Sequence, residues 1–208
     1  MKLYYHPLSP YSRKVRAALL YRDEPHELEV VDVRSGALAS PAFRALSPFG
    51  KMPVLVTDDG PMIETSSIIE WLEERGPRRL LPRGTERVAR HWDRIGDLYL
   101  MDPQSTLFFQ PNTEAATEAR ATVHAAWRLF ADRLEGRAFV CGDLFTLGDL
   151  SGAIATAYLE RLGEEPPDVV RAWRERIYAL PALVQTTEEG EGELATALER
   201  RRARTDGS

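Results

Sequence analysis

Ser9-Pro10-Tyr11-Ser12 is the turn around which the chain is organised, and residues 9–16 read SPYSRKVR. The turn follows a short apolar run, 2–5, that predicts a strand, and it precedes a helical pattern over 11–22. Its spacing is that of a redox Cys-x-x-Cys turn in which hydroxyls replace both sulfurs. A helix N-terminus stabilises a thiolate. The turn therefore predicts a site for a thiolate that belongs to a ligand.

The segments around this turn predict a βαβαββα unit over residues 1–77. Residues 27–33 predict a mostly buried strand, which makes the first three elements a β-α-β unit with parallel strands. A short helix, a hairpin around Asp58-Asp59-Gly60 and an amphipathic helix are predicted next, over 41–46, 54–63 and 65–75. This order of elements predicts an α/β, thioredoxin-like domain.

Beyond residue 84 the strand signal nearly vanishes, and the pattern predicts an all-α domain over 85–208. The proline- and arginine-rich segment 78–84 is interpreted as a linker. The first long helix is expected to break or kink at Pro103. The other expected helices are separated by proline, glycine and acidic stretches, over 113–134, 146–162, 166–178, 181–188 and 194–204.

Composition limits the functions that are open to the chain. The 208 residues carry a net charge of -5, which argues against broad nucleic-acid binding. No apolar run reaches the length of a membrane span, and no secretory segment is present, so a cytoplasmic protein is expected. The four histidines lack metal-ligand spacing, so no metal site is expected.

Two features are given structural interpretations. The single cysteine, Cys141, lies in an apolar connector and is expected to pack there, so no disulfide framework is possible. The basic cluster at the C-terminus is interpreted as a solvated helix end that suits the negative end of the helix dipole; it comprises Arg200, Arg201, Arg202 and Arg204.

Four ordered matches resemble the cytosolic glutathione transferase superfamily, in particular its serine-type groups such as zeta-, theta- and tau-like bacterial members. They are SPYSRKVR at 9–16, GKMPVL at 50–55, IETSSIIEWL at 63–72 and FTLGDL at 145–150. Each match alone is weak, but the ordered set spans most of residues 1–160. The resemblance implies a glutathione-binding domain over 1–77 and a helical domain over 85–208 that lines the electrophile pocket.

The resemblance also implies how glutathione binds. Pro53 is expected to follow a cis peptide bond, which leaves the backbone N–H and C=O of Met52 free to bind an extended peptide. Thr65 and the helix N-terminus suit a carboxylate, and Glu64 suits an α-amino group. The family more often has serine at 65, but threonine preserves the hydroxyl. Lys51 is expected to pair with a carboxylate of the ligand, or to remain a solvated loop residue.

Three hydroxyls compete to stabilise the thiolate of glutathione. Ser9 occupies the position that serine-type members use and precedes the helix, so it is favoured. Tyr5 ends the first strand, where tyrosine-type members carry their tyrosine. Ser12 is the third candidate, although its hydroxyl also suits bonding to its own backbone. Thr146 and Asp149 have the spacing of a reciprocal helix cap, so they are interpreted as structural.

The implied function is an enzyme that conjugates glutathione, as co-substrate, to a small hydrophobic electrophile in detoxification. The expected electrophile pocket is aromatic and apolar, and its candidate residues are Tyr11, Tyr99, Met101, Phe108 and Phe109. The alternatives are a glutathione-dependent isomerase or dehalogenase, and a binding or regulatory module without turnover. The resemblance also implies a homodimer, in which Asp97 or Asp102 reaches the ligand amine of the neighbouring subunit.

Overall fold

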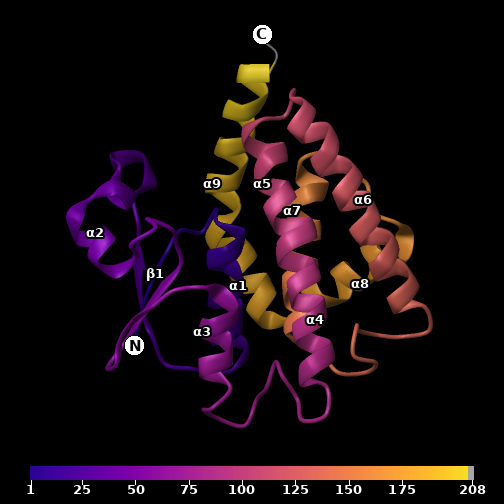
Figure 1. Cartoon of the computed structure of the whole chain (residues 1–208), viewed down its shortest axis with the longest axis horizontal. Coiled ribbons are helices and arrows are strands. Elements are labelled where there is room, and N and C mark those ends of the chain that lie inside the picture. Colours follow the sequence, from indigo (N-terminus) through magenta and orange to yellow (C-terminus); the bar gives the residue numbers. More distant parts are fainter. Residues whose placement is uncertain (206–208) are drawn as a thin grey trace.

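The computed structural model describes the backbone of residues 1–205 and the surroundings of the side chains of residues 1–201. A small α/β part and a larger all-helical part lie side by side, and the long C-terminal helix runs between them (Figure 1). This arrangement confirms the predicted fold class. No helix among the described residues is both long and apolar enough to cross a membrane.

The α/β part contains a mixed sheet with the strand order β2-β1-β3-β4. Its strands are β1 (Lys2–Tyr5), β2 (Glu27–Val30), β3 (Val54–Thr57) and β4 (Gly60–Met62). β1 is parallel to β2 and antiparallel to β3, and β3 pairs with β4 through the tight turn that the sequence predicts. β1 is an inner strand, so its C-terminal end and the turn that follows it lie in the middle of the domain.

Helices cover both faces of the sheet. They are α1 (Pro10–Tyr21), α2 (Pro41–Leu46) and α3 (Thr65–Leu72), with two short 3-10 turns, η1 (Val33–Ser35) and η2 (Ala37–Ala39). One face packs apolar residues of α1 and α3 against Leu3 and Leu55, while Phe43 of α2 packs with Val31 and Val54. Burying both faces fixes the register of the strands.

The expectation of a mostly buried strand over 27–33 is wrong. The strand ends at Val30, all four of its residues are exposed, and Val30 retains 52% of its accessible surface. The reason is topological, because β2 is an edge strand that pairs only with β1. Val31, just beyond the strand, is buried in the core.

The helical part begins with a helix that is interrupted as predicted. Its elements are α4 (Glu86–Gly96), the π-helical turn η3 (Asp97–Met101), α5 (Asp102–Phe109), α6 (Glu114–Leu134), α7 (Leu147–Arg161), α8 (Asp168–Tyr178) and α9 (Pro181–Thr205). Pro103 occupies the first turn of α5, immediately after η3. The wide turn accommodates a residue that has no N–H to donate.

The N-terminus of α7 carries the capping box that the sequence predicts. The buried carboxylate of Asp149 accepts the backbone N–H of Thr146 at 2.9 Å and its hydroxyl at 2.8 Å. It also accepts the Val140 N–H and the indole N–H of Trp173. Burial raises the pKa of Asp149, while these four donors oppose that rise. The carboxylate thus ties α7 to α8 and to the preceding connector.

The C-terminal segment forms one continuous helix, α9, although its sequence predicts two helices separated by an acidic, glycine-containing stretch. A Cβ at Gly190 would lie 2.7 Å from Nη2 of Arg13 and 3.0 Å from the carbonyl oxygen of Pro7. Gly190 therefore lets α9 pass closely over the turn before α1. The glycine serves a tertiary contact and does not end the helix.

This packing predicts opposite effects for two glycines of α9. Gly190→Ala should lower the free energy of unfolding by about 1–3 kcal/mol, because the added methyl group overpacks a tight contact. Gly192→Ala is the control, since nothing lies within 4 Å of its Cβ position. It should raise the free energy by up to about 1 kcal/mol through helix propensity. Urea unfolding of both variants measures the difference, and equal effects would contradict the close approach.

Candidate active site

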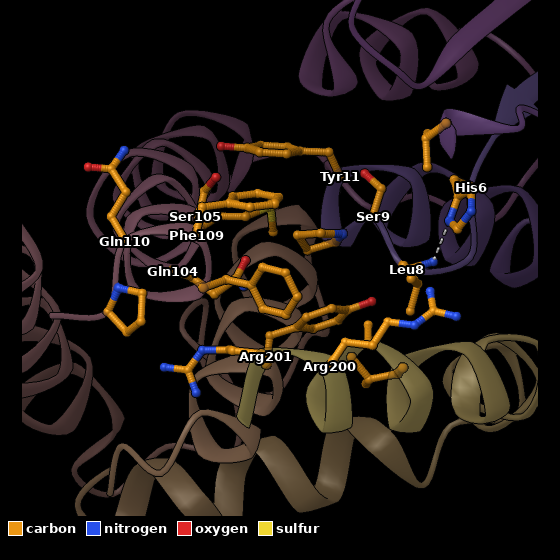
Figure 2. A pocket seen from close by; sticks show the side chains of 18 of the residues that line it. His6, Leu8, Ser9, Tyr11, Gln104, Ser105, Phe109, Gln110, Arg200 and Arg201 are labelled. Atoms are coloured by element: carbon orange, nitrogen blue, oxygen red, sulfur yellow. Dashed lines mark hydrogen bonds between the residues drawn. The ribbon is translucent and has the colours of Figure 1, made fainter. Parts of the chain in front are cut away.

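A cavity of about 650 Å³ opens between the two parts of the protein. Its walls come from the turn after β1, from η1, from α5 and the loop that follows it, and from the C-terminal part of α9. Figure 2 shows His6, Ser9 and Tyr11 along one wall and Arg200 and Arg201 along the opposite wall. The lining is mainly apolar and aromatic, which is typical of a small-molecule site.

Ser9 is the hydroxyl residue that links this cavity to a helix N-terminus. It is the N-cap of α1, and its Oγ accepts the backbone N–H of Ser12 at 3.2 Å. Among the described residues, no acceptor takes the proton of the Ser9 hydroxyl. Because Ser9 also lines the cavity, a hydroxyl donor and the positive end of α1 act at the same place.

The two other hydroxyl candidates are placed differently. Tyr5 is buried in the sheet and lies outside the cavity lining, and burial raises the pKa of its hydroxyl. Ser12 is completely buried, and its Oγ accepts the backbone N–H of His6 at 3.3 Å. Of the three, only Ser9 borders the cavity.

The Met52–Pro53 peptide bond is cis, as the resemblance implies. β3 begins at Val54, which pairs with Tyr4, so the backbone of Met52 lies outside the sheet ladder. Met52 lines the cavity and Pro53 is buried. An unpaired backbone segment of this kind is suited to β-like hydrogen bonding with an extended peptide.

The remaining predicted glutathione contacts lie beside the cavity. Glu64 is exposed at the N-cap of α3 and has a φ of 69°, which is uncommon for a residue with a side chain. Thr65 is the first residue of α3 and is buried, whereas Lys51 is exposed. None of these three residues belongs to the cavity lining.

Four of the five residues expected in the electrophile pocket line the cavity, namely Tyr11, Met101, Phe108 and Phe109. Tyr99 is not part of the cavity lining, and its side chain is 50% exposed. Met101, Gln104, Ser105 and Phe108 recur at the spacing of one helix face. Tyr99 precedes Met101 by two residues, and helix residues two apart do not share a face.

The two aspartates that were expected to reach a neighbouring subunit differ in placement. Asp97 is buried and its carboxylate is held by Lys14, so the expectation fails for this residue. Asp102 is exposed and accepts the hydroxyl proton of Tyr11. Burial raises the pKa of Tyr11, and the hydrogen bond to Asp102 raises it further. Tyr11 therefore remains a neutral phenol at the cavity wall.

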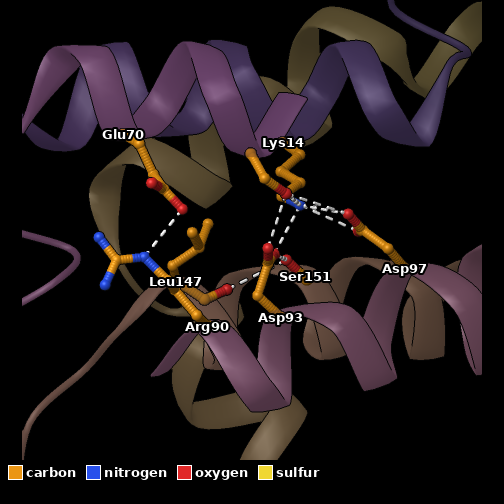
Figure 3. A network of polar contacts seen from close by, with 8 residues as sticks. Lys14, Glu70, Arg90, Asp93, Asp97, Leu147 and Ser151 are labelled. Carbon is orange, nitrogen blue, oxygen red and sulfur yellow. Dashed lines mark hydrogen bonds and ion pairs between the residues drawn. The ribbon is translucent and has the colours of Figure 1, made fainter. Parts of the chain in front are cut away.

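Lys14 is the centre of a buried polar network that joins the two parts of the protein (Figure 3). Its Nζ lies 2.6 Å from Asp93 and 2.8 Å from Asp97, both on the helical side. Ser66, the residue after Thr65, donates its hydroxyl to Asp93 at 2.7 Å. Burial raises the pKa of Asp97, and the Lys14 cation opposes that rise. The network therefore fixes the start of α3 against α4.

The interpretation of the C-terminal arginines as a solvated helix end agrees with the exposure of Arg200 but is wrong for Arg201, which is half-buried. Arg200 and Arg201 line the cavity, and Arg201 donates to the carbonyl oxygen of Leu107 at 3.2 Å. The side chains of Arg202 and Arg204 lie outside the described residues. The signal in the sequence is the helical spacing of Leu194, Ala197 and Arg201, all of which line the cavity.

Comparison with protein families gives two matches along the chain. Residues 3–80 match the N-terminal domain model of glutathione S-transferases, and residues 95–181 match the C-terminal domain model. Together these matches include the turn after β1, the cis-proline loop, α3 and α5, but they end before the part of α9 that lines the cavity.

Individual relatives agree with these matches. Glutathione S-transferase 3 of Zea mays is 29% identical over 205 residues, which cover 89% of this chain and 92% of the relative. Dichloromethane dehalogenase of Methylorubrum extorquens is 27% identical over 202 residues, covering 84% of this chain and 66% of the relative. The crystal structure of Gtt2 from Saccharomyces cerevisiae has a TM-score of 0.80 at 24% identity, covering 89% of this chain and all of that one.

Proposed function

The chain belongs to the cytosolic glutathione S-transferase family, and on that premise we propose that it conjugates the thiolate of glutathione to a small hydrophobic electrophile. The observation that carries the proposal is the position of Ser9. Its hydroxyl and the N-terminus of α1 meet at the wall of an apolar cavity. That is the arrangement a bound thiol needs in order to lose its proton near neutral pH.

The required effect is modest in energy. A free thiol has a pKa of about 8.5, so it is mostly protonated at neutral pH. A hydrogen bond to a charged group contributes about 1.5–3 kcal/mol, and a helix N-terminus adds about 0.3–1 kcal/mol. Since one pKa unit corresponds to about 1.4 kcal/mol, the two together lower the thiol pKa by about 1–3 units. The thiolate then attacks the electrophile as nucleophile.

The rest of glutathione extends from Ser9 along the edge of the α/β part. In this proposal the free backbone of Met52 binds the peptide, next to the cis Pro53. Glu64 receives the α-amino group, and Thr65 with the N-terminus of α3 binds the adjacent carboxylate. Lys51 is exposed and supplies a cation for the other carboxylate. Tyr11, Met101, Phe108 and Phe109 hold the electrophile.

The experiment that tests this function combines binding with turnover. Calorimetry should give saturable glutathione binding, and conjugation of an aryl halide should depend on both substrates. An absence of glutathione binding would overturn the proposal and leave a binding or regulatory module of this fold. Glutathione binding without aryl-halide turnover would argue against conjugation and favour another reaction of the bound thiolate.

A second candidate is a dehalogenase, and the relative from Methylorubrum extorquens favours it. Displacement of halide from an alkyl halide uses the same thiolate and the same Ser9. Halide release from dihalomethane, compared with aryl-halide conjugation, separates the two reactions. Isomerisation of a cis-enone acid is assayed alongside them.

We also propose a homodimer acting in detoxification, in which the exposed Asp102 faces the neighbouring ligand; sedimentation analysis tests the dimer.

A further inference from the structure

The charged side chains of the cavity wall all have the same sign. Arg34, Arg200 and Arg201 line the cavity, and no aspartate or glutamate does so among the described residues. This contrasts with the whole chain, whose net charge is -5. A low-dielectric cleft with charges of one sign concentrates ligands of the opposite sign.

Two of the arginines lie on the wall that faces Ser9 (Figure 2). Figure 2 shows the side chains of Arg200 and Arg201 along the wall formed by α9, across from Ser9 and Tyr11. The guanidinium of Arg200 extends toward Leu8, and that of Arg201 toward the other end of the cavity. Arg34 enters the lining from η1.

Two nearby acids on α9 have basic partners and line a neighbouring hollow that shares Arg34 and His6 with the cavity. Glu189 forms an ion pair with Arg16 at 2.7 Å, and Glu193 lies 3.3 Å from Nε2 of His6. Neither carboxylate lines the cavity. Among the described residues, Arg200 and Arg34 make no ion pair, whereas Arg201 is held by the carbonyl oxygen of Leu107. Arg200 is therefore a guanidinium at the cavity wall with its donors available to a ligand.

We propose that the cavity selects electrophiles that carry a carboxylate on an apolar body, and that Arg200 binds this carboxylate. This inference rests on the proposed transferase function and names its substrate class. Phe108 and Met101 contact the apolar body, while the reactive carbon faces Ser9. Arg201 adds to the positive potential, and the planar guanidinium of Arg200 matches the two oxygens of a carboxylate.

The test compares two electrophiles that differ in one charge, chlorodinitrobenzoate and its neutral primary amide. The wild-type protein should prefer the acid, as measured by kcat/KM. In Arg200→Gln/Arg201→Gln the acid-to-amide ratio should fall about tenfold, because a charge-assisted contact is lost. The control Arg87→Gln/Arg128→Gln removes the same charge from two exposed arginines outside the cavity, so its ratio should match wild type. Raising the salt concentration should weaken the preference.

Two results would overturn the proposal while the transferase function stands. One is a wild-type protein that conjugates the amide as well as the acid. The other is a double variant in which the KM for glutathione rises and the acid-to-amide ratio does not change, because the arginines would then serve glutathione.

A binding measurement separates the two proposals. Dinitrobenzoate has no leaving group, so its affinity is measured by calorimetry without turnover. Tighter binding of dinitrobenzoate than of its amide, with about a tenfold loss in the double variant, supports the anion site even if no conjugation occurs. Equal affinities for the two compounds overturn the site, whatever the protein catalyses. Thermal melting confirms that each variant is folded.

Discussion

Ser9→Ala is expected to lower kcat/KM for conjugation by about a hundredfold, the usual effect of removing one donor from a developing or fixed anion. The affinity for glutathione should change little, because the other contacts remain. The pKa of the bound thiol should rise toward that of free glutathione. Thiolate absorbance, titrated against pH in the binary complex, measures this shift directly.

Matched variants separate catalysis from the capping role of Ser9. Loss of the N-cap in Ser9→Ala costs about 1 kcal/mol of stability, whereas glycine is tolerated there at a cost of a few tenths. Ser9→Gly should therefore lose activity while remaining stable, and Ser9→Thr should retain both the hydroxyl and the cap. A thiol pKa that is the same in Ser9→Ala and in the wild type would refute the role of the hydroxyl.

Lys14→Met is expected to have the largest effect on stability. It leaves Asp93 and Asp97 in a buried site without their cation. Removing one partner of a buried ion pair costs about 3–5 kcal/mol. Urea unfolding measures this loss. Lys2→Met is the control, because Lys2 pairs with Glu29 at the surface and its removal should have a far smaller effect.

The loss in Lys14→Met should depend on pH. Burial already raises the pKa of Asp97, and without the cation that pKa rises further. The folded variant then binds more protons than the unfolded chain, so its stability falls as pH rises. The deficit should be largest near about pH 8 and should shrink toward about pH 5. Adding Asp97→Asn should recover part of the loss, and a pH-independent deficit would contradict this explanation.

Features determined by a few neighbouring residues could be predicted from the sequence. The cap at Ser9, the hairpin at Asp58-Asp59-Gly60 and the capping box at Thr146 follow from local hydrogen bonding and turn chemistry. The cis peptide before Pro53 required the family resemblance, because proline at a strand start is also common in the trans form.

Features determined by distant contacts could not be predicted. The apolar pattern of 27–33 does not reveal that β2 pairs on only one side. Gly190 resembles a helix terminator until Pro7 and Arg13 are known to lie against it. The residues around Lys14 do not reveal that α4 and η3 each supply a carboxylate that pairs with it in the protein interior.

The cavity also combines residues whose place is set locally with residues whose place is set by distant contacts. Ser9 and Tyr11 belong to the turn that the sequence singles out, so their place in the site could be predicted. The contribution of Arg200 depends on the continuity of α9 and on its path across the cavity. That path arises from packing between parts of the chain far apart in sequence, which hydrophobic periodicity alone does not reveal.

A crystal structure of the protein soaked with glutathione tests the role of Ser9, because it locates the sulfur. We expect the sulfur within about 3.5 Å of Oγ of Ser9, at the N-terminus of α1, with the peptide backbone paired to Met52. A sulfur that instead contacts the hydroxyl of Tyr11, or that lies away from the α1 N-terminus, would contradict the role of Ser9.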